Sequence, residues 1–179
     1  MTQSDSDQFA EDHATANAEG FFNTWYEKPA MLRLLGDVTG HRILDAGCGS
    51  GPTSVALTER GADVSGFDLS AAMIEIARRR LLGTDLQVHD LAEPLPWQDA
   101  TFNTVVASLV LHYLQDWSGP LTEFHRVLTP GGRGCWSRST TRARSRSCTR
   151  IWSISGSPST PRTMTSLASA WTSPSSTGQ

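Results

Sequence analysis

Residues 43–52 combine an acidic side chain with glycines in a spacing typical of a ligand-binding loop. An apolar run ends in Asp45, and three glycines follow at alternate positions: Gly47, Gly49 and Gly51. Because glycine has no Cβ, such a loop can adopt positive φ and lets a ligand lie directly against the peptide planes. The segment therefore predicts a strand that turns into a nucleotide-binding loop, and an adenosyl cofactor is the leading hypothesis for its ligand.

Two further acidic residues follow strand-like segments downstream of this loop. Asp68 comes 21 residues after Gly47 and directly follows the segment 62–67, and Asp90 directly follows the segment 86–89. A carboxylate at the position of Asp68 commonly accepts hydrogen bonds from ribose hydroxyls. If these segments are parallel strands of one sheet, the three carboxylates line one crevice at its carboxyl edge, where open α/β folds bind ligands.

The elements that would position these carboxylates alternate along the chain. Four helices are expected, at residues 29–35, 53–60, 71–82 and 120–128. Ser70 would cap the third, and residues 129–132 would stop the last. Four strands are expected between them, at residues 41–45, 62–67, 86–89 and 103–109. Right-handed crossovers then give a Rossmann-like α/β fold, with a doubly wound, mostly parallel sheet and helices on both faces.

Composition and charge narrow the function classes. A chain of 179 residues with 38% hydrophobic and 18% charged residues is typical of one globular unit. It contains no run of about 18 apolar residues and no signal-peptide pattern at its start, so we expect a cytoplasmic protein without a membrane partner. Three cysteines without framework spacing fit a reducing compartment and predict no metal site. No feature of the sequence indicates an oligomeric state.

The charges divide the chain into two unlike parts. All 18 acidic residues lie in 1–133, whereas residues 134–179 carry six Arg and no acid. The acidic first part does not favour nucleic acid as a partner. We expect a flexible arm over 1–18, a folded domain over 19–133 and a disordered Ser/Thr/Arg-rich tail over 134–179.

Five segments together resemble the ordered motifs of the class I S-adenosylmethionine-dependent methyltransferases, in the type 11 group. They cover much of residues 20–133 and lie at 44–51, 66–70, 90–91, 94–97 and 127–132. A nicotinamide-dependent oxidoreductase is the rival interpretation. Its dinucleotide loop would favour a third glycine at the position of Pro52, so the G-x-G-x-G spacing disfavours it.

The resemblance implies that the glycine loop holds the methionine part and the ribose of S-adenosylmethionine. Gly47, Cys48 and Gly49 would offer close backbone contact, and Asp45 would fix the loop and attract the cationic amino end. Asp68 would accept both ribose hydroxyls. Carboxylates suit a cofactor that carries sulfonium and ammonium charges and no phosphate. The alternative for Asp68 is a cap of the following helix.

The resemblance also implies contacts for the adenine ring and the methyl group. Leu69 and Met73 would pack on the ring, Asp90 and the Leu91 amide would read its polar edge, and Ser108 would border the methyl group. The alternative for Met73 is a place in the core.

His112 and Tyr113 follow the fourth predicted strand and lie near the expected transfer site. Either could contact substrate, or both could be ordinary residues at a helix start. We expect His125 to face solvent, and Tyr26 could belong to a lid or to the core. The sequence identifies no catalytic base. Such a base is optional, since proximity and alignment can carry much of a methyl transfer from a sulfonium. The acceptor is expected to be a small molecule.

After Gly132 the chain departs from the family pattern, which would continue with an apolar fifth strand and substrate-covering elements. We therefore expect disrupted C-terminal strands, an exposed fourth strand and a chain that is weakly active or a non-catalytic cofactor-binding remnant. Three interpretations of the tail compete: an RNA-binding basic arm, a linker or an out-of-frame translation. Shifting the frame by one base from Cys135 allows an apolar strand-like run, which favours the third.

Overall fold

The computed structural model describes residues 28–137 and 150–153, and the predicted arm over 1–18 and Tyr26 lie outside this part. Its helices are α3 (Lys28–Leu35), α4 (Pro52–Thr58), α5 (Ala71–Arg80), the single 3-10 turn η2 (Leu111–Tyr113) and α6 (Ser118–Val127). Its strands are β1 (Arg42–Ala46), β2 (Asp63–Asp68), β3 (Asp85–Val88), β4 (Phe102–Ala107), β5 (Leu128–Trp136) and β6 (Arg150–Ser153). The four helices and four strands expected from the sequence are present, each end within two residues of its predicted position.

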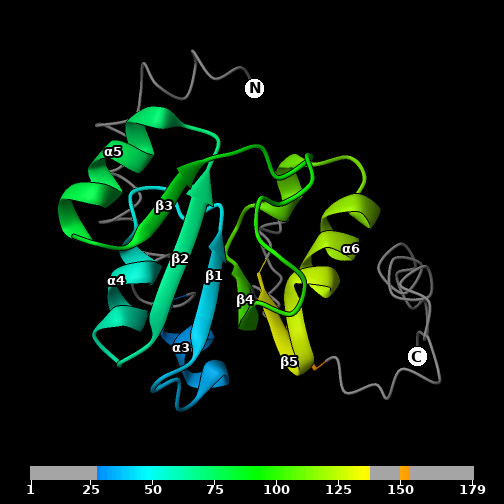
Figure 1. Ribbon diagram of the computed structural model, residues 1–179, viewed down its shortest axis with the longest axis horizontal. Coiled ribbons are helices and arrows are strands. Elements are labelled where there is room, and N and C mark those ends of the chain that lie inside the picture. Colours follow the sequence, from blue (N-terminus) through cyan, green and yellow to red (C-terminus); the bar gives the residue numbers. More distant parts are fainter. Residues whose placement is uncertain (1–27, 138–149, 154–179) are drawn as a thin grey trace, which may run out of the picture.

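The strands form one sheet in the order β3-β2-β1-β4-β5-β6. Neighbours from β3 to β5 pair in parallel, and β6 pairs antiparallel with β5. The chain moves outward from β1 to β3 and then crosses back to β4 on the other side of β1 (Figure 1). Open α/β sheets bind ligands where the strand order reverses in this way, and the order confirms the predicted doubly wound fold.

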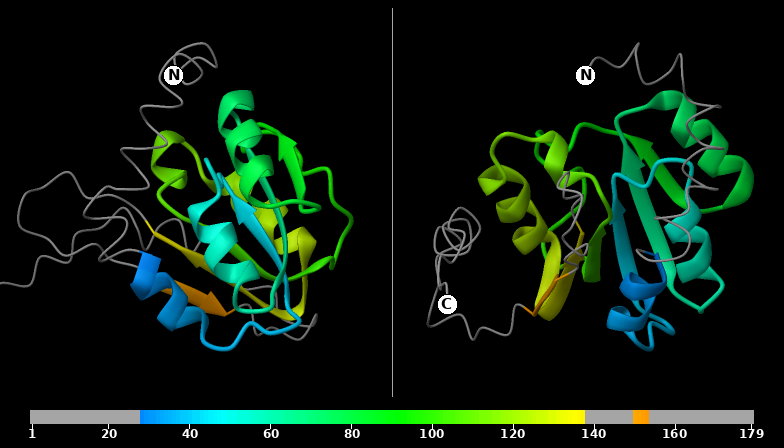
Figure 2. Two further views of the ribbon diagram at one scale, coloured as in Figure 1. Left: turned by 90° about the vertical axis from the view of Figure 1, so that its left-hand side faces the viewer. Right: turned by 180° about the vertical axis from the view of Figure 1, so that it is seen from behind.

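Helices cover both faces of the sheet because consecutive strand residues point to opposite sides. Ile43 and Val106 pack with Met31 of α3 and Leu57 of α4 in one buried cluster. Leu44 and Val105 instead pack with residues of α6 on the other face. Figure 1 and Figure 2 show α3, α4 and α5 on one side of the sheet and α6 on the other. The two apolar layers hold the carboxyl ends of β1 and β2 in fixed positions.

The strands that follow β4 differ from the sequence prediction. β5 begins directly after α6 and pairs with β4, so the fourth strand is not an exposed edge. Phe102 pairs with Leu128 and Thr104 with Arg133, so 129–132, which follow the end of α6 as predicted, form a local bulge in β5. The strand continues to Trp136, three residues beyond the predicted end of the folded domain at 133. The expectation of a disordered tail otherwise falls mostly outside the described residues.

Helix α5 begins as its sequence predicts. The Ser70 side chain accepts a hydrogen bond from the Met73 amide at 3.3 Å, satisfying one of the amides that a helix start leaves without a partner. This contact orients the helix that directly follows Asp68.

We expect Ser70→Ala to lower the free energy of unfolding by about 1 kcal/mol, because it removes the N-cap acceptor. Ser70→Gly is the matched comparison, since glycine at this position costs only about a few tenths of a kcal/mol. Urea unfolding of both variants measures the difference. Equal losses would show that the Ser70 hydroxyl does not cap α5.

Candidate cofactor site

The glycine loop follows β1 and uses glycine where the backbone requires it. Gly47, Gly49 and Gly51 have φ values of 73°, 55° and 84°, which other residues rarely adopt. The amides of Gly47 and Cys48 both donate to the Phe67 carbonyl, at 2.8 and 2.9 Å. The loop is therefore attached to the end of β2, one residue before Asp68.

Asp68 is bound to the glycine loop through its carboxylate. Its Oδ2 accepts from the Gly49 amide at 2.9 Å and its Oδ1 from the Ser70 amide at 3.0 Å. Each oxygen retains capacity for a further hydrogen bond. Burial raises the pKa of Asp68, and the bonds from Ser70 and Gly49 offset this only in part. The N-cap of α5 is Ser70, whose side chain accepts from the Met73 amide, whereas Asp68 binds the amide of Ser70 itself.

Asp45 lies beneath the same loop. It is 1% exposed, and its Oδ2 accepts from the Ser54 hydroxyl of α4 at 2.6 Å. Burial, together with the negative charges of Asp45 and Asp68, raises the pKa of the Cys48 thiol. The two carboxylates thus act on one loop residue from neighbouring strands. Cys48 is a buried, neutral thiol, which does not suit a nucleophile.

The side chains predicted for the adenine ring differ in accessibility. Leu69 is 39% exposed, which leaves its apolar surface available to a ring. Met73 is 9% exposed and packs against Ala72 and Ile76, as a core residue does.

Asp90 lies two residues beyond β3 at the same sheet edge, and its Oδ1 accepts from the Ala92 amide at 2.9 Å. Its neighbour Leu91 is buried in the core. The His89 amide donates to the Asp68 carbonyl at 3.0 Å, which ties this segment to the end of β2.

The segment after β4 borders the glycine loop. Ser108 follows the strand directly and is half-buried. His112 and Tyr113 are exposed in η2, with ring centroids 4.2 Å apart, and desolvation lowers the pKa of His112. His125 of α6 is exposed, as predicted.

Sequence reasoning missed Val110, which stands where a Cβ on Gly47 would lie. A hydrophobic residue after β4 carries no signal of this contact in the sequence alone.

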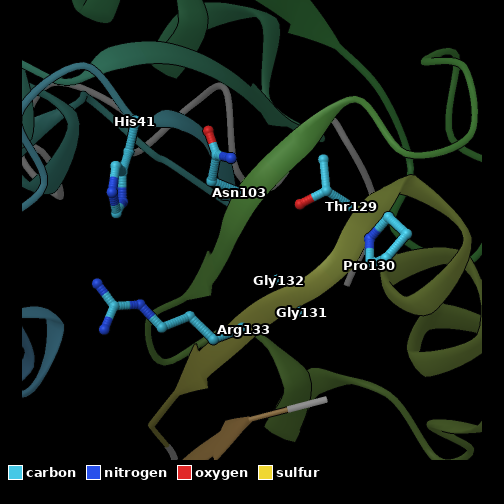
Figure 3. A pocket seen from close by; sticks show the side chains of 7 residues that line it. All are labelled: His41, Asn103, Thr129, Pro130, Gly131, Gly132 and Arg133. Carbon is cyan, nitrogen blue, oxygen red and sulfur yellow. The ribbon is translucent and has the colours of Figure 1, made fainter. Parts of the chain in front are cut away.

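A pocket of about 450 Å³ lies elsewhere, beside the starts of β1 and β4 and the bulge of β5. None of the predicted site residues lines it; its lining comprises His41, Asn103, Thr129, Pro130, Gly131, Gly132 and Arg133. In Figure 3, His41 and Arg133 lie on one side of the β4 ribbon, and Thr129 and Pro130 lie on the other. The polar groups do not converge on one point, so we place the candidate site at the glycine loop.

The residues at the glycine loop fit an adenosyl cofactor. A Cβ on Gly49 would meet nothing within 4 Å, so the backbone there is open to a ligand. Asp68 beside it has free acceptor capacity, whereas a phosphate would be repelled by the carboxylates. The fold and loop define a Rossmann-like protein with a site suited to a cofactor that lacks phosphate.

Comparison with known proteins agrees with this class. Residues 44–135 match a family model described as a methyltransferase domain. The demethylmenaquinone methyltransferase of Clavibacter sepedonicus is 42% identical over 106 residues, which are 58% of this chain and 43% of that protein. The magnesium-protoporphyrin O-methyltransferase of Rhodobacter capsulatus is 43% identical over 100 residues, or 52% of this chain and 43% of that protein.

Among solved structures, an S-adenosylmethionine-dependent methyltransferase from Mesorhizobium loti superposes with a TM-score of 0.57 and 35% identity. The match covers 64% of this chain and 52% of that one. The chain belongs to the methyltransferase domain family, whose cofactor is S-adenosylmethionine. It spans about half the length of the curated relatives it matches.

No group of His, Cys, Asp and Glu within 28–137 and 150–153 could hold a metal ion. None of the helices seen there has the length and apolar character needed to cross a bilayer.

Proposed function

We propose that this chain binds S-adenosylmethionine at the glycine loop and transfers its methyl group to a small-molecule acceptor. The observation that carries the proposal is the Asp68 carboxylate, held against the Gly49 amide at the carboxyl edge of the sheet. A carboxylate so fixed can accept both ribose hydroxyls without reorganising, which lowers the cost of binding.

The remaining cofactor contacts follow from the placement of each residue. The Gly47, Cys48 and Gly49 backbone would lie against the methionine part, and buried Asp45 would supply negative potential beneath the cationic amino end. Exposed Leu69 would cover one face of the adenine ring. Met73 would support Leu69 from the core side, because only a small part of its surface is accessible.

The other residues at this edge would contact the adenine rim and the reacting end. Asp90 and the Leu91 amide would read the polar edge of the adenine, and Ser108 would lie beside the methyl group. His112 and Tyr113 would face the acceptor, since both are exposed directly after β4.

When bound, S-adenosylmethionine supplies a methyl group on a positively charged sulfur, an electrophile that needs no further activation. The chain's own contribution is then to hold the two reactants in line, and orientation of this kind is worth about 7–11 kcal/mol. Desolvation lowers the pKa of His112, which favours the neutral imidazole, the form able to take a proton from the substrate group that receives the methyl.

The small-molecule acceptor is supported by the relatives. The two curated relatives described above are named for methylating demethylmenaquinone and magnesium-protoporphyrin. Nucleic acid is a poor alternative, because residues 1–133 contain twice as many acidic as basic side chains. The cytoplasmic location stays a prediction from the sequence.

Calorimetric titration of the purified chain with S-adenosylhomocysteine and with NADH tests the cofactor. We expect binding of the first and none of the second; tight NADH binding would instead support the oxidoreductase alternative. A methyl-transfer screen with labelled cofactor, against quinol, porphyrin and nucleic-acid acceptors, tests the reaction. Transfer to nucleic acid alone would overturn the small-molecule proposal.

A second candidate is a chain that binds the cofactor but turns over slowly. It is favoured by the composition of residues 134–179, which carry 13 Ser, 8 Thr and six Arg but no Asp, Glu, Phe, Tyr or Val. Such a segment has few side chains able to enclose an acceptor and exclude water. Binding of S-adenosylhomocysteine without turnover in the screen, and a gene whose frame shifts near the codon for Cys135, would support it.

A further inference from the structure

The loop between β3 and β4 is tied to α6 by a single arginine. Arg126 donates through Nη2 to the Leu95 carbonyl at 2.9 Å and through Nη1 to the Trp97 carbonyl at 2.8 Å. Its Nη1 also donates to Asp99 Oδ1 at 2.9 Å. One guanidinium thus contacts three positions of a loop that contains no helix or strand.

Glu123, one turn earlier on α6, completes this arrangement. Arg126 donates to both of its carboxylate oxygens, from Nε at 2.9 Å and from Nη2 at 2.7 Å. The Leu95 amide donates to Glu123 Oε2 at 2.7 Å. Both the amide and the carbonyl of Leu95 are therefore bound by the pair, which fixes the path of the backbone there. The side chains of Arg126 and Glu123 are only 29% and 19% exposed, so water screens this ion pair weakly.

The same loop begins at the candidate cofactor site. Asp90 and Leu91 are its first residues after His89, and Leu91 and Leu95 lie in one buried cluster with Phe67. The Trp97 ring lies 5.8 Å from the ring of Phe67, the residue before Asp68. Packed side chains thus connect the loop at Leu95 with Leu91, the neighbour of Asp90, and with the end of β2.

We propose that Arg126, oriented by Glu123, is a positioning residue that holds Asp90 and the Leu91 amide where they read the polar edge of the adenine ring. This inference rests on the proposed function, because it assigns a purpose to a contact outside the cofactor site. Arg126 does not touch the cofactor; it determines where the residues that do are held. The bidentate pair requires the planar fork of arginine, which lysine cannot reproduce.

Discrimination between two ligands separates this role from a general structural one. S-Inosylhomocysteine differs from S-adenosylhomocysteine by an oxygen in place of the 6-amino group and a hydrogen on N1, so the donor and the acceptor on this edge exchange places. We expect the wild-type chain to prefer S-adenosylhomocysteine by about tenfold or more, as a lost directional polar contact predicts. Arg126→Met and Glu123→Gln should reduce that preference to about twofold, mainly by weakening S-adenosylhomocysteine binding. If Arg126 has a purely structural role, the two variants should weaken the binding of both ligands equally.

Arg60→Met is the matched control, because Arg60 also donates to a backbone carbonyl, that of Leu32 at 3.0 Å, but far from the loop. It should leave the preference unchanged. Arg126→Lys keeps the charge and serves as a second variant if Arg126→Met does not fold. It should lose most of the preference for S-adenosylhomocysteine. Thermal unfolding checks that each variant is folded at the assay temperature.

Asp90→Asn distinguishes the possible failures. A preference lost in Asp90→Asn but retained in both Arg126 variants would overturn the positioning role alone. A wild-type chain that binds both ligands equally would overturn the adenine assignment of Asp90, and with it this inference. Absence of S-adenosylhomocysteine binding by the wild-type chain would overturn the proposed function itself.

Discussion

Asp68→Ala is expected to lower the affinity of the chain for S-adenosylhomocysteine by about 100-fold or more. A hydrogen bond to a charged group contributes about 1.5–3 kcal/mol, and Asp68 is proposed to accept two from the ribose. The sum is at least about 3 kcal/mol, and each 1.4 kcal/mol is about tenfold in affinity. The variant also loses the carboxylate that binds the Gly49 amide, so the glycine loop is less well ordered before binding.

The pH dependence of binding gives this prediction a second readout. Burial raises the pKa of Asp68, and a protonated carboxyl loses acceptor capacity. Wild-type affinity should therefore fall as the pH decreases through that raised pKa, while the residual affinity of Asp68→Ala should not change over the same range. Titration calorimetry at a series of pH values measures both.

Asp63→Asn is the matched control for Asp68, because Asp63 is exposed at the opposite end of the same strand. It should bind S-adenosylhomocysteine as the wild type does. If Asp68→Ala binds as tightly as this control, the ribose site lies elsewhere.

The positions of the site residues follow from patterns that are local in sequence. The three glycines, the strand-ending Asp68 and the Ser70 cap are each recognised within a few residues, because backbone conformation and capping depend on neighbours along the chain. Their convergence follows from alternation of strands and helices, since parallel strands present their carboxyl ends at one edge.

Other features depend on contacts between distant segments and could not be predicted in this way. Residues 129–132 are expected to stop the preceding helix, because proline and glycine cannot continue it, and the composition of the tail predicts no strand after them. Pairing of β5 with β4 extends the strand past them to Trp136. The Arg126 contacts with Leu95 and Trp97 span 31 and 29 residues, and no local pattern marks them. The resemblance assigns cofactor roles residue by residue, whereas such supporting contacts are visible only in the folded chain.

Gly47→Ala is expected to lower the free energy of unfolding by about 3 kcal/mol and to abolish detectable cofactor binding. Two costs add: a φ of 73°, which costs a residue other than glycine about 1–2 kcal/mol, and a Cβ that would overlap the Val110 side chain. Overpacking of this kind typically costs about 1–3 kcal/mol. Any relief by movement of the loop would displace the amides of Gly47 and Cys48 from the Phe67 carbonyl, and with them the proposed cofactor contacts.

Two further variants separate the two costs of Gly47→Ala. Gly36→Ala introduces a Cβ at a φ of 66° with nothing within 4 Å, so urea unfolding should show only the conformational cost of about 1–2 kcal/mol. Adding Val110→Ala to Gly47→Ala should recover the steric part, measured relative to Val110→Ala alone because that truncation has its own cost. If Gly47→Ala and Gly36→Ala lose the same stability, Val110 yields freely to the new methyl group. In that case the glycine is required for its backbone conformation alone, and the segment after β4 does not hold the loop in place.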